Sequence, residues 1–179
     1  MAELIYGYGK SRYFYASKPE TGTVPTSGTE LVGVITASGG TVTKSYGEVR
    51  PLNSDGFADR FSTIADVENL TLSCVRPKSD GIYTGADSTG TYAKLREWVD
   101  TVGVNTVDSD KCVIECIPRG NNTYEGSMWI CTPESVKDHD RELEGFQGYD
   151  CSFICIGPKV PIEVTYTKST DSFAFAEVD

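Results

Sequence analysis

The chain has 179 residues, of which 39% are hydrophobic, and a formal net charge of −10 at pH 7. This length predicts one domain, residues 1–179, with a core of its own, and the aromatic content of 11% excludes wholesale disorder. The acidic balance argues against a nucleic-acid grip built on phosphate contacts, because such a grip needs clustered lysine and arginine. It leaves room for nucleic acid that slides past a repelling wall.

The ends of the chain and its cysteines indicate a cytoplasmic origin. The first ten residues, MAELIYGYGK, are too short and too polar for a secretory signal peptide. No run approaches the length of a membrane-spanning helix, so we expect no membrane anchor. Without a signal, we expect the six cysteines to be buried reduced thiols rather than disulfides.

The first half of the chain alternates predicted strands with loops. The predicted strands are 4–17 (one strand or two short ones), 31–37 (LVGVITA, buried), 41–46 and 67–76. Gly39 and Gly40 predict a turn that joins the strands before and after them into a hairpin. Leu70, Leu72 and Cys74 alternate with polar residues, which predicts a strand with one buried face.

A long charged segment, about residues 47–64, shows no sustained hydrophobic period and predicts a long loop. It carries isolated hydrophobic residues: Val49, Leu52, Phe57 and Phe61. One interpretation is a floppy surface loop. The other is an arm that orders against another subunit, where these four side chains would be buried.

The centre of the chain predicts a helix followed by a hairpin. Tyr92, Leu95 and Val99 recur at helical spacing with Trp98 beside them, so a helix of about residues 91–102 is expected, capped by Asp87, Ser88 or Thr91. Two strands follow, 111–120 and 124–132, joined by a turn at Asn121-Asn122. So short a helix cannot bury its apolar face alone and needs a sheet to receive it.

The C-terminal part predicts fewer regular elements. Residues 132–144 are very polar, 146–157 and 162–167 read as strands, and the rest is a loose acidic tail. Seven or eight short strands and one helix indicate a mainly β fold, an antiparallel β-sandwich or barrel with one flanking α-helix.

The cysteine spacing argues against a metal site. Cys112 and Cys116 lie four apart on one predicted strand, as do Cys151 and Cys155, and such pairs stand roughly 13 Å apart. A turn at Asn121-Asn122 would place Cys112 opposite Cys131, with Cys151 or Cys155 beside them. We therefore expect a row of buried thiols on one sheet face, with a cross-strand disulfide as the less favoured alternative.

Acidic residues and the single histidine share one polar stretch. Asp138, Asp140, Glu142 and Glu144 recur at every second position, which indicates either a solvated hairpin or an acidic wall that faces a channel. His139 lies among them without the signature of a nucleophile. No phosphate-binding loop is present. We expect no enzyme, no catalytic residue, no metal and no cofactor.

The order of elements is the most specific signal. It runs from strand LVGVITA through the charged loop, strand ENLTLSCV, the helix with Trp98, the hairpin after it and a polar excursion to a strand that closes in Gly157-Pro158. Over about Leu31 to Val160, this order resembles the tail tube, or major tail, proteins of long-tailed bacteriophages.

The resemblance implies a structural virion protein, assembled in the host cytoplasm and located in the tail. Six copies would form a ring by joining sheets edge to edge, and rings would stack into a hollow tube through which DNA passes without specific binding. The loop would reach a neighbouring subunit through Val49, Leu52, Phe57 and Phe61. Other tail proteins (tape measure, terminator and baseplate side) would be partners.

Two other function classes stay open at this point. The first is a monomeric β-sandwich binding module on a virion or bacterial surface, with Tyr6, Tyr8, Tyr13 and Tyr15 as its platform. The second, least favoured, is an enzyme that uses His139.

Overall fold

The computed structural model describes residues 11–17, 24–49, 59–76, 91–101, 111–139 and 147–178. In chain order, its elements are β1 (Arg12–Ser17), β2 (Thr29–Glu30), β3 (Val34–Ser38), β4 (Val42–Val49), β5 (Asp59–Val67), β6 (Leu70–Val75), α1 (Thr91–Thr101), β7 (Lys111–Gly120), β8 (Thr123–Asp138), β9 (Gly148–Cys155), β10 (Val160–Thr167) and β11 (Ser172–Glu177). The chain is mainly β with one helix in this described part, which confirms the predicted class.

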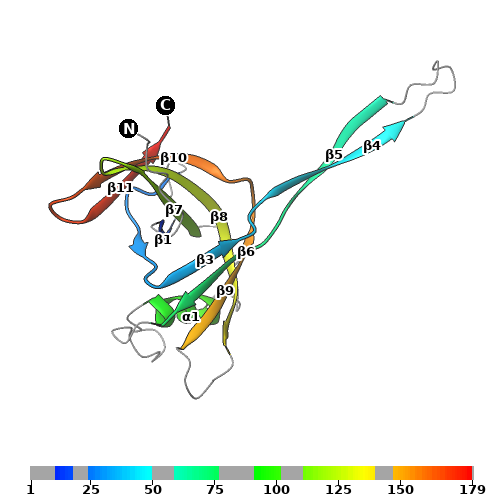
Figure 1. The fold of residues 1–179 in the computed structure, drawn as a ribbon. Helices are drawn as coiled ribbons and strands as arrows, with labels where there is room; N and C mark the ends of the chain where they lie inside the picture. The colour runs from blue at the N-terminus through cyan, green and yellow to red at the C-terminus, as the bar shows by residue number, and fades with distance from the viewer. Residues whose placement is uncertain are drawn as a thin grey trace, which may run out of the picture.

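Nine strands form one bent antiparallel sheet, seven of them in the order β2-β1-β7-β8-β9-β6-β3 (Figure 1). The 16-residue strand β8 lies at its centre. Its first half pairs with β7 and β10, and its second half pairs with β9. The C-terminal strands add β10 to β8 and β11 to β10, while β4 and β5 form a separate two-stranded sheet. In the described residues the sheet does not close into a barrel.

The predicted turn of the central hairpin is confirmed. Asn121 and Asn122 have φ values of 49° and 61°, the left-handed pair that a two-residue hairpin turn requires and that asparagine tolerates. An irregularity between Pro118 and Gly120 then shifts the register of β7 against β8 by one residue. This bulge decides which side chains of β7 face which core.

The first core lies between the bent sheet and α1. Tyr92, Leu95 and Trp98 supply the buried face of the helix, as the spacing predicts. The Trp98 ring stands 5.9 Å from that of Phe153 on β9, edge to face. Thr91 begins the helix, and its Oγ1 accepts a hydrogen bond from Val32 N (2.9 Å), which ties the helix to the segment before β3. Asp87 and Ser88 lie outside the described residues.

A second core lies on the other face of β7. Phe14, Ile114, Met128, Ile162 and Phe175 are its largest members, and the β10–β11 hairpin covers it. Because β7 is covered on both faces, its sequence is hydrophobic at consecutive positions rather than alternating.

The predicted hairpin across Gly39-Gly40 is wrong. Strand β3 pairs with β6, and β4 pairs with β5. The two glycines have φ values of 87° and 69° and lead the chain out of the main sheet rather than back along β3. The expectation that 31–37 is buried also fails for β3, because this strand lies at a sheet edge and Ile35 is 57% exposed.

Two polar segments are more regular than the sequence predicts. The stretch predicted as a polar excursion continues β8 as far as Asp138, held by pairing with β9. The tail predicted as loose forms β11, in register with β10 from Ser172 to Glu177. In both cases pairing with a neighbouring strand holds the segment in place. Val136 of β8 and Phe175 of β11 also contribute buried side chains to the two cores.

Gly40→Ala should destabilise the fold by about 2–4 kcal/mol, because a side chain there is strained and overlaps its surroundings. At this φ, an added Cβ would lie 2.4 Å from Trp129 Nε1, which donates a hydrogen bond to Gly40 O (3.3 Å). The measurement is the free energy of unfolding in urea. Gly157→Ala is the matched control, since a Cβ there meets nothing within 4 Å. Equal losses in both variants would contradict the assignment.

Candidate assembly surfaces

The hairpin β4–β5 projects from the body of the molecule as an arm (Figure 1). Its strands pair from Val42 opposite Val67 to Val49 opposite Asp59, with an irregularity between Lys44 and Tyr46. Eight residues of strand span about 27 Å. Among the described residues, β4 and β5 pair only with each other, so both outer edges of the arm lack a backbone partner in this part of the chain.

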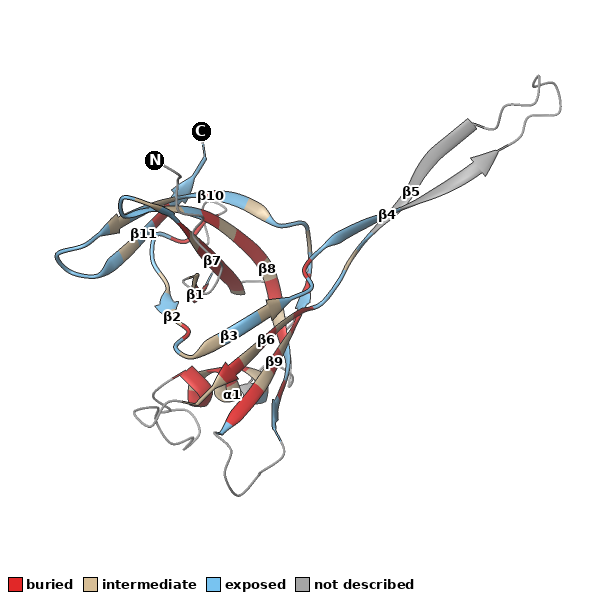
Figure 2. Cartoon of the chain, in the orientation of Figure 1, coloured by how far each residue is buried: buried red, intermediate tan, exposed pale blue. Residues whose placement is uncertain are grey.

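The two chain segments at the root of the arm are bonded to each other. Glu68 N donates to Thr41 O (3.0 Å), and Thr41 Oγ1 donates to Glu68 Oε2. Just beyond, Val42 is 40% exposed. The described base of the arm is coloured mostly as exposed in Figure 2. The arm is therefore closed at its root and has apolar surface at its base.

The four hydrophobic residues predicted as contacts map to this arm in part. Val49 is the last residue of β4, and Phe61 lies on β5 opposite Gly47. Leu52 and Phe57 lie outside the described residues. The segment predicted as one long loop is thus strand at both ends, 47–49 and 59–64.

The second candidate surface is the edge of the main sheet at β3. This strand pairs with β6 alone among the described residues, and the pairing is irregular between Val34 and Thr36. Ile35 and the nearby Val32 are 57% and 50% exposed. An irregular edge with exposed apolar side chains is a surface that natural proteins usually protect or pair.

A pocket of about 560 Å³ adjoins this edge, between β3 and the inner face of β7 and β8. At its wall, buried Glu115 accepts hydrogen bonds from the Tyr13 hydroxyl (2.8 Å) and from Lys159 Nζ (2.6 Å). Lys159 also lies over the Trp129 ring, 4.3 Å from its centroid. Each charge in this group has a partner, so the pocket presents a neutral, ordered wall.

The tyrosine platform of the binding-module hypothesis is not formed as expected. Tyr13 is buried, and burial together with its bond to Glu115 raises the pKa of its hydroxyl. Tyr15 packs on Trp98, with ring centroids 5.6 Å apart. Tyr6 and Tyr8 lie outside the described residues. Two of the four rings therefore serve the interior of the fold.

Of the four predicted acidic residues, only Asp138 is described. It ends β8, is exposed, and accepts a hydrogen bond from the Tyr92 hydroxyl, which adds to the rise that burial causes in the pKa of Tyr92. Asp140, Glu142 and Glu144 lie outside the described residues. The acidic wall therefore stays a prediction.

His139 lies at the end of β8 and contacts residues of β9 through its side chain and its backbone. Its Nε2 lies 2.9 Å from Asp150 Oδ1, and Ser73 Oγ donates to the same oxygen. These bonds to Ser73 and His139 lower the pKa of Asp150. A catalytic triad places histidine between the serine and the carboxylate, whereas here the carboxylate lies between the other two. Also, His139 N donates to Gly148 O (2.9 Å), which closes the end of β8 onto β9.

All six cysteines are buried and free, as expected. The predicted alignment of Cys112 with Cys131 is wrong by one residue, because the bulge at Arg119 places Cys112 opposite Ile130. Cys112 and Cys116 consequently face the second core, and the other four face the first, so the predicted row of thiols on one sheet face is wrong. No group of three or more histidine, cysteine, aspartate or glutamate side chains in the described residues could hold a metal ion.

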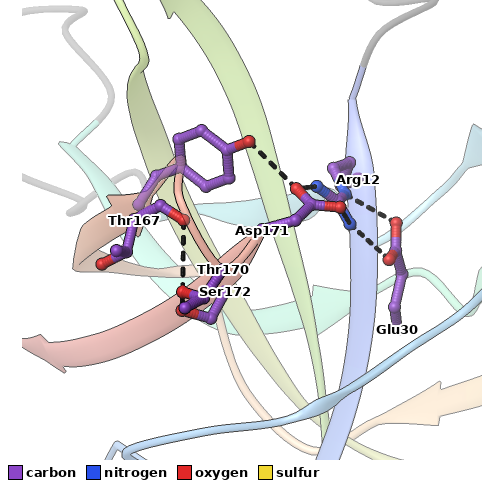
Figure 3. Close-up of polar contacts among 7 residues, drawn as sticks. Arg12, Glu30, Thr167, Thr170, Asp171 and Ser172 are labelled. Atoms are coloured by element: carbon purple, nitrogen blue, oxygen red, sulfur yellow. Dashed lines mark hydrogen bonds and ion pairs between the residues drawn. The ribbon is translucent and has the colours of Figure 1, made fainter.

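The β10–β11 hairpin is anchored by Arg12 of β1 (Figure 3). The Arg12 guanidinium donates to Glu30 on β2 (2.6 and 2.5 Å) and to Asp171 Oδ1 in the hairpin turn (2.7 Å). It also stacks 4.6 Å from the centre of the Phe173 ring. The Tyr166 hydroxyl donates to Asp171 Oδ1 (2.9 Å). One cation thus joins β1, β2 and the C-terminal hairpin.

Comparison with known proteins identifies the architecture. No family model and no curated protein matches the sequence. Among solved structures, a chain of the sheath–tube complex of an extracellular contractile injection system (PVC) is similar, with a TM-score of 0.61 and 12% identity, covering 91% of this chain and 95% of that one. The anti-feeding prophage tube-terminating cap gives a TM-score of 0.55 at 15% identity, covering 91% and 99%.

A phage tail protein is also similar in structure. The tail tube of SPP1 gives a TM-score of 0.53 at 13% identity, covering 88% of this chain and 78% of that one. The chain has the tail-tube fold. The resemblance read from the order of elements is therefore confirmed by the structure. The described residues also contain no helix long and apolar enough to cross a membrane.

Asp171→Asn should loosen the β10–β11 hairpin at pH 7. Bonds to Arg12 and Tyr166 lower the pKa of Asp171 in the folded state. Its carboxylate therefore stabilises the fold above the unfolded pKa, near 3.8, and this contribution is lost as pH falls through the still lower folded value. Asparagine tolerates the φ of 47° at this position, so the backbone is retained.

The measurement is the difference in melting temperature between wild type and Asp171→Asn from pH 7 to pH 2. We expect wild type to be more stable at pH 7 and the difference to close below about pH 3.8. Ser169→Ala, in the same exposed turn, is the control. A difference that stays constant with pH would show that the carboxylate charge has no part in anchoring the hairpin.

Proposed function

We propose that this protein is the subunit of a hollow tail tube. Copies would assemble into hexameric rings, and rings would stack into a conduit for DNA delivery into the host. The observation that carries the proposal is the projecting β4–β5 arm on a tail-tube fold, because an isolated two-stranded hairpin is marginally stable in water. A neighbouring subunit would supply the surface that the arm lacks.

The arm is the proposed contact between subunits. Val49 and Phe61 lie on its strands, and Leu52 and Phe57 belong to the segment between them. Burying one such side chain contributes about 1.5–3 kcal/mol, so four per subunit, repeated around a ring, could offset the cost of ordering.

The open edge at β3 supports ring closure in the same way. An exposed edge is a hazard in a monomer, but rotational symmetry can pair each edge with the next subunit until none remains open. The apolar residues Val32 and Ile35 would then lie within a subunit contact rather than in water.

The charge of the chain suits a DNA conduit. A net charge of −10 gives a surface that repels the phosphate backbone, so DNA would slide without specific binding. We assign Asp138, Asp140, Glu142 and Glu144 to the wall of the lumen. The proposed location is the virion tail, after assembly in the host cytoplasm, with tape measure, terminator and baseplate-side proteins as further partners.

The arm is tested by removing it without disturbing its root. Thr43 and Asp66 are cross-strand partners, so replacing residues 44–65 with Asn-Gly should close a two-residue turn between them. We expect the variant to fold but to form no tubes in negative-stain electron microscopy over a concentration series, with light scattering on the same samples. Far-ultraviolet circular dichroism and the melting temperature control for folding.

Long tubes from the armless variant would contradict the assignment of the arm. Wild-type protein that stays monomeric at every concentration, also when seeded with preformed tail ends, would contradict the tube proposal itself. That second outcome would favour a monomeric binding module.

The lumen assignment has its own test. Changing Asp138, Asp140, Glu142 and Glu144 together to Asn, Asn, Gln and Gln should leave tube assembly intact and slow DNA ejection from virions that carry the variant, because the repelling charge is lost. The control neutralises Glu163 and Glu177, exposed acids of the C-terminal hairpin. Unchanged ejection with the first variant would remove the four residues from the lumen wall.

A further inference from the structure

Two of the buried thiols are direct cross-strand partners. Cys131 on β8 faces Cys155 on β9. The adjacent pair is bonded through its backbone, since Ile156 N donates to Ile130 O (2.9 Å). In an antiparallel ladder, bonded and non-bonded pairs alternate, so Cys131 and Cys155 form a non-bonded pair, with Cα atoms about 4.5 Å apart and side chains close. Disulfides span Cα separations of about 4.4–6.8 Å.

The other four thiols are not placed in this way. Cys74 faces Tyr149 and Cys151 faces Leu72, so these two cysteines are diagonal neighbours, a spacing of about 7–8 Å. Cys112 and Cys116 belong to the second core, on the other side of the sheet. All six cysteines lie in the described residues, and Cys131–Cys155 is the one pair in direct register.

We infer that Cys131 and Cys155 form an oxidation site, at which a small peroxide converts the two thiols into a cross-strand disulfide. The bond would join β8 to β9 at the position where β8 passes from its β7 pairing to its β9 pairing. This inference concerns the subunit alone and goes beyond the proposed tube role.

The chemistry requires one peroxide and yields water. Cys155 is 8% exposed and Cys131 is fully buried, so peroxide reaches Cys155 first. The Cys155 thiolate attacks one peroxide oxygen, the O–O bond breaks, and a sulfenic acid and hydroxide form. Cys131 then loses its proton and its sulfur attacks the Cys155 sulfur. The S–S bond forms, the S–O bond breaks, and the second hydroxide leaves, combining with the released protons as water.

Burial makes this reaction slow. It raises the pKa of both thiols, so the thiolate fraction is small at neutral pH and grows as pH rises. The thiols are therefore expected to stay reduced in a cytoplasm and to oxidise after release into an oxidising medium. The rate of oxidation should increase with pH between about 7 and 9.

The test uses the purified full-length protein, treated with hydrogen peroxide or with dithiothreitol. Free thiols are alkylated in denaturant, and tryptic peptides are analysed by mass spectrometry. Cleavage leaves Cys131 in residues 120–137 and Cys155, with Cys151, in residues 142–159. We expect a peroxide-dependent link between these two peptides, while the peptide 112–119 remains fully alkylated.

Two variants assign the link to one sulfur. Cys151→Ala should retain it, and Cys155→Ala should lose it. A link that survives Cys155→Ala, a link that involves Cys74 or Cys112, or no link in wild type would each overturn the inference. The wild-type result stands without either variant, so a folding defect in a variant leaves the test intact.

Thermal unfolding gives a second readout. A disulfide that closes the loop between residues 131 and 155 without distortion should raise the melting temperature of oxidised wild type by about 5–10 °C. Peroxide should produce no such rise in Cys131→Ala. An unchanged or lower melting temperature of the linked protein would overturn the claim that the native register accommodates the bond.

Discussion

The continuity of β8 is the constraint on which the rest of the molecule depends. Its backbone pairs with β7 as far as Ile130, with β10 from Gly126 to Met128, and with β9 from Cys131 onward. Since successive side chains of a strand point to opposite faces, Met128 enters the second core and Trp129 enters the first. One strand thus determines the position of α1 under the sheet, the C-terminal hairpin above it and, through the Trp129 bond to Gly40, the exit of the arm.

The parts of the fold that the sequence predicts are those with a local signature. The helical spacing of Tyr92, Leu95 and Trp98 places α1, and the asparagine pair at 121–122 places the β7–β8 turn. The pairing of β3 with β6 has no such signature, because the partners are separated by the whole arm. Two glycines after a strand indicate a turn, whether the chain folds back along that strand or leaves the sheet. Here the Trp129 side chain beside Gly40 accompanies the second case.

The predicted site residues also differ in whether a local sequence pattern reveals them. The isolated hydrophobics of the segment 47–64 were predicted as contacts because they show no sustained period, and the sequence did not indicate that Val49 and Phe61 lie on strands. The register of the thiols could not be predicted from the sequence, since one extra residue at Arg119 moves Cys112 from one face of the sheet to the other. The Arg12 anchor was missed as well, because it joins residues 159 positions apart and leaves no pattern in either segment.

Open edges and net charge act against each other in this molecule. The edge at β3, which has no further partner among the described strands, and the arm favour association with other chains, and irregular association of such edges leads to aggregation. The net charge of −10 makes each subunit repel the next, so a chance contact is unfavourable unless it buries apolar surface and pairs backbone groups at once. In our proposal only the ring geometry satisfies both conditions, because the arm and the edge are engaged by neighbours in the same step. In the proposed tube, acidity would therefore serve assembly as well as the passage of DNA, because it would remove the weak contacts and leave the symmetric one.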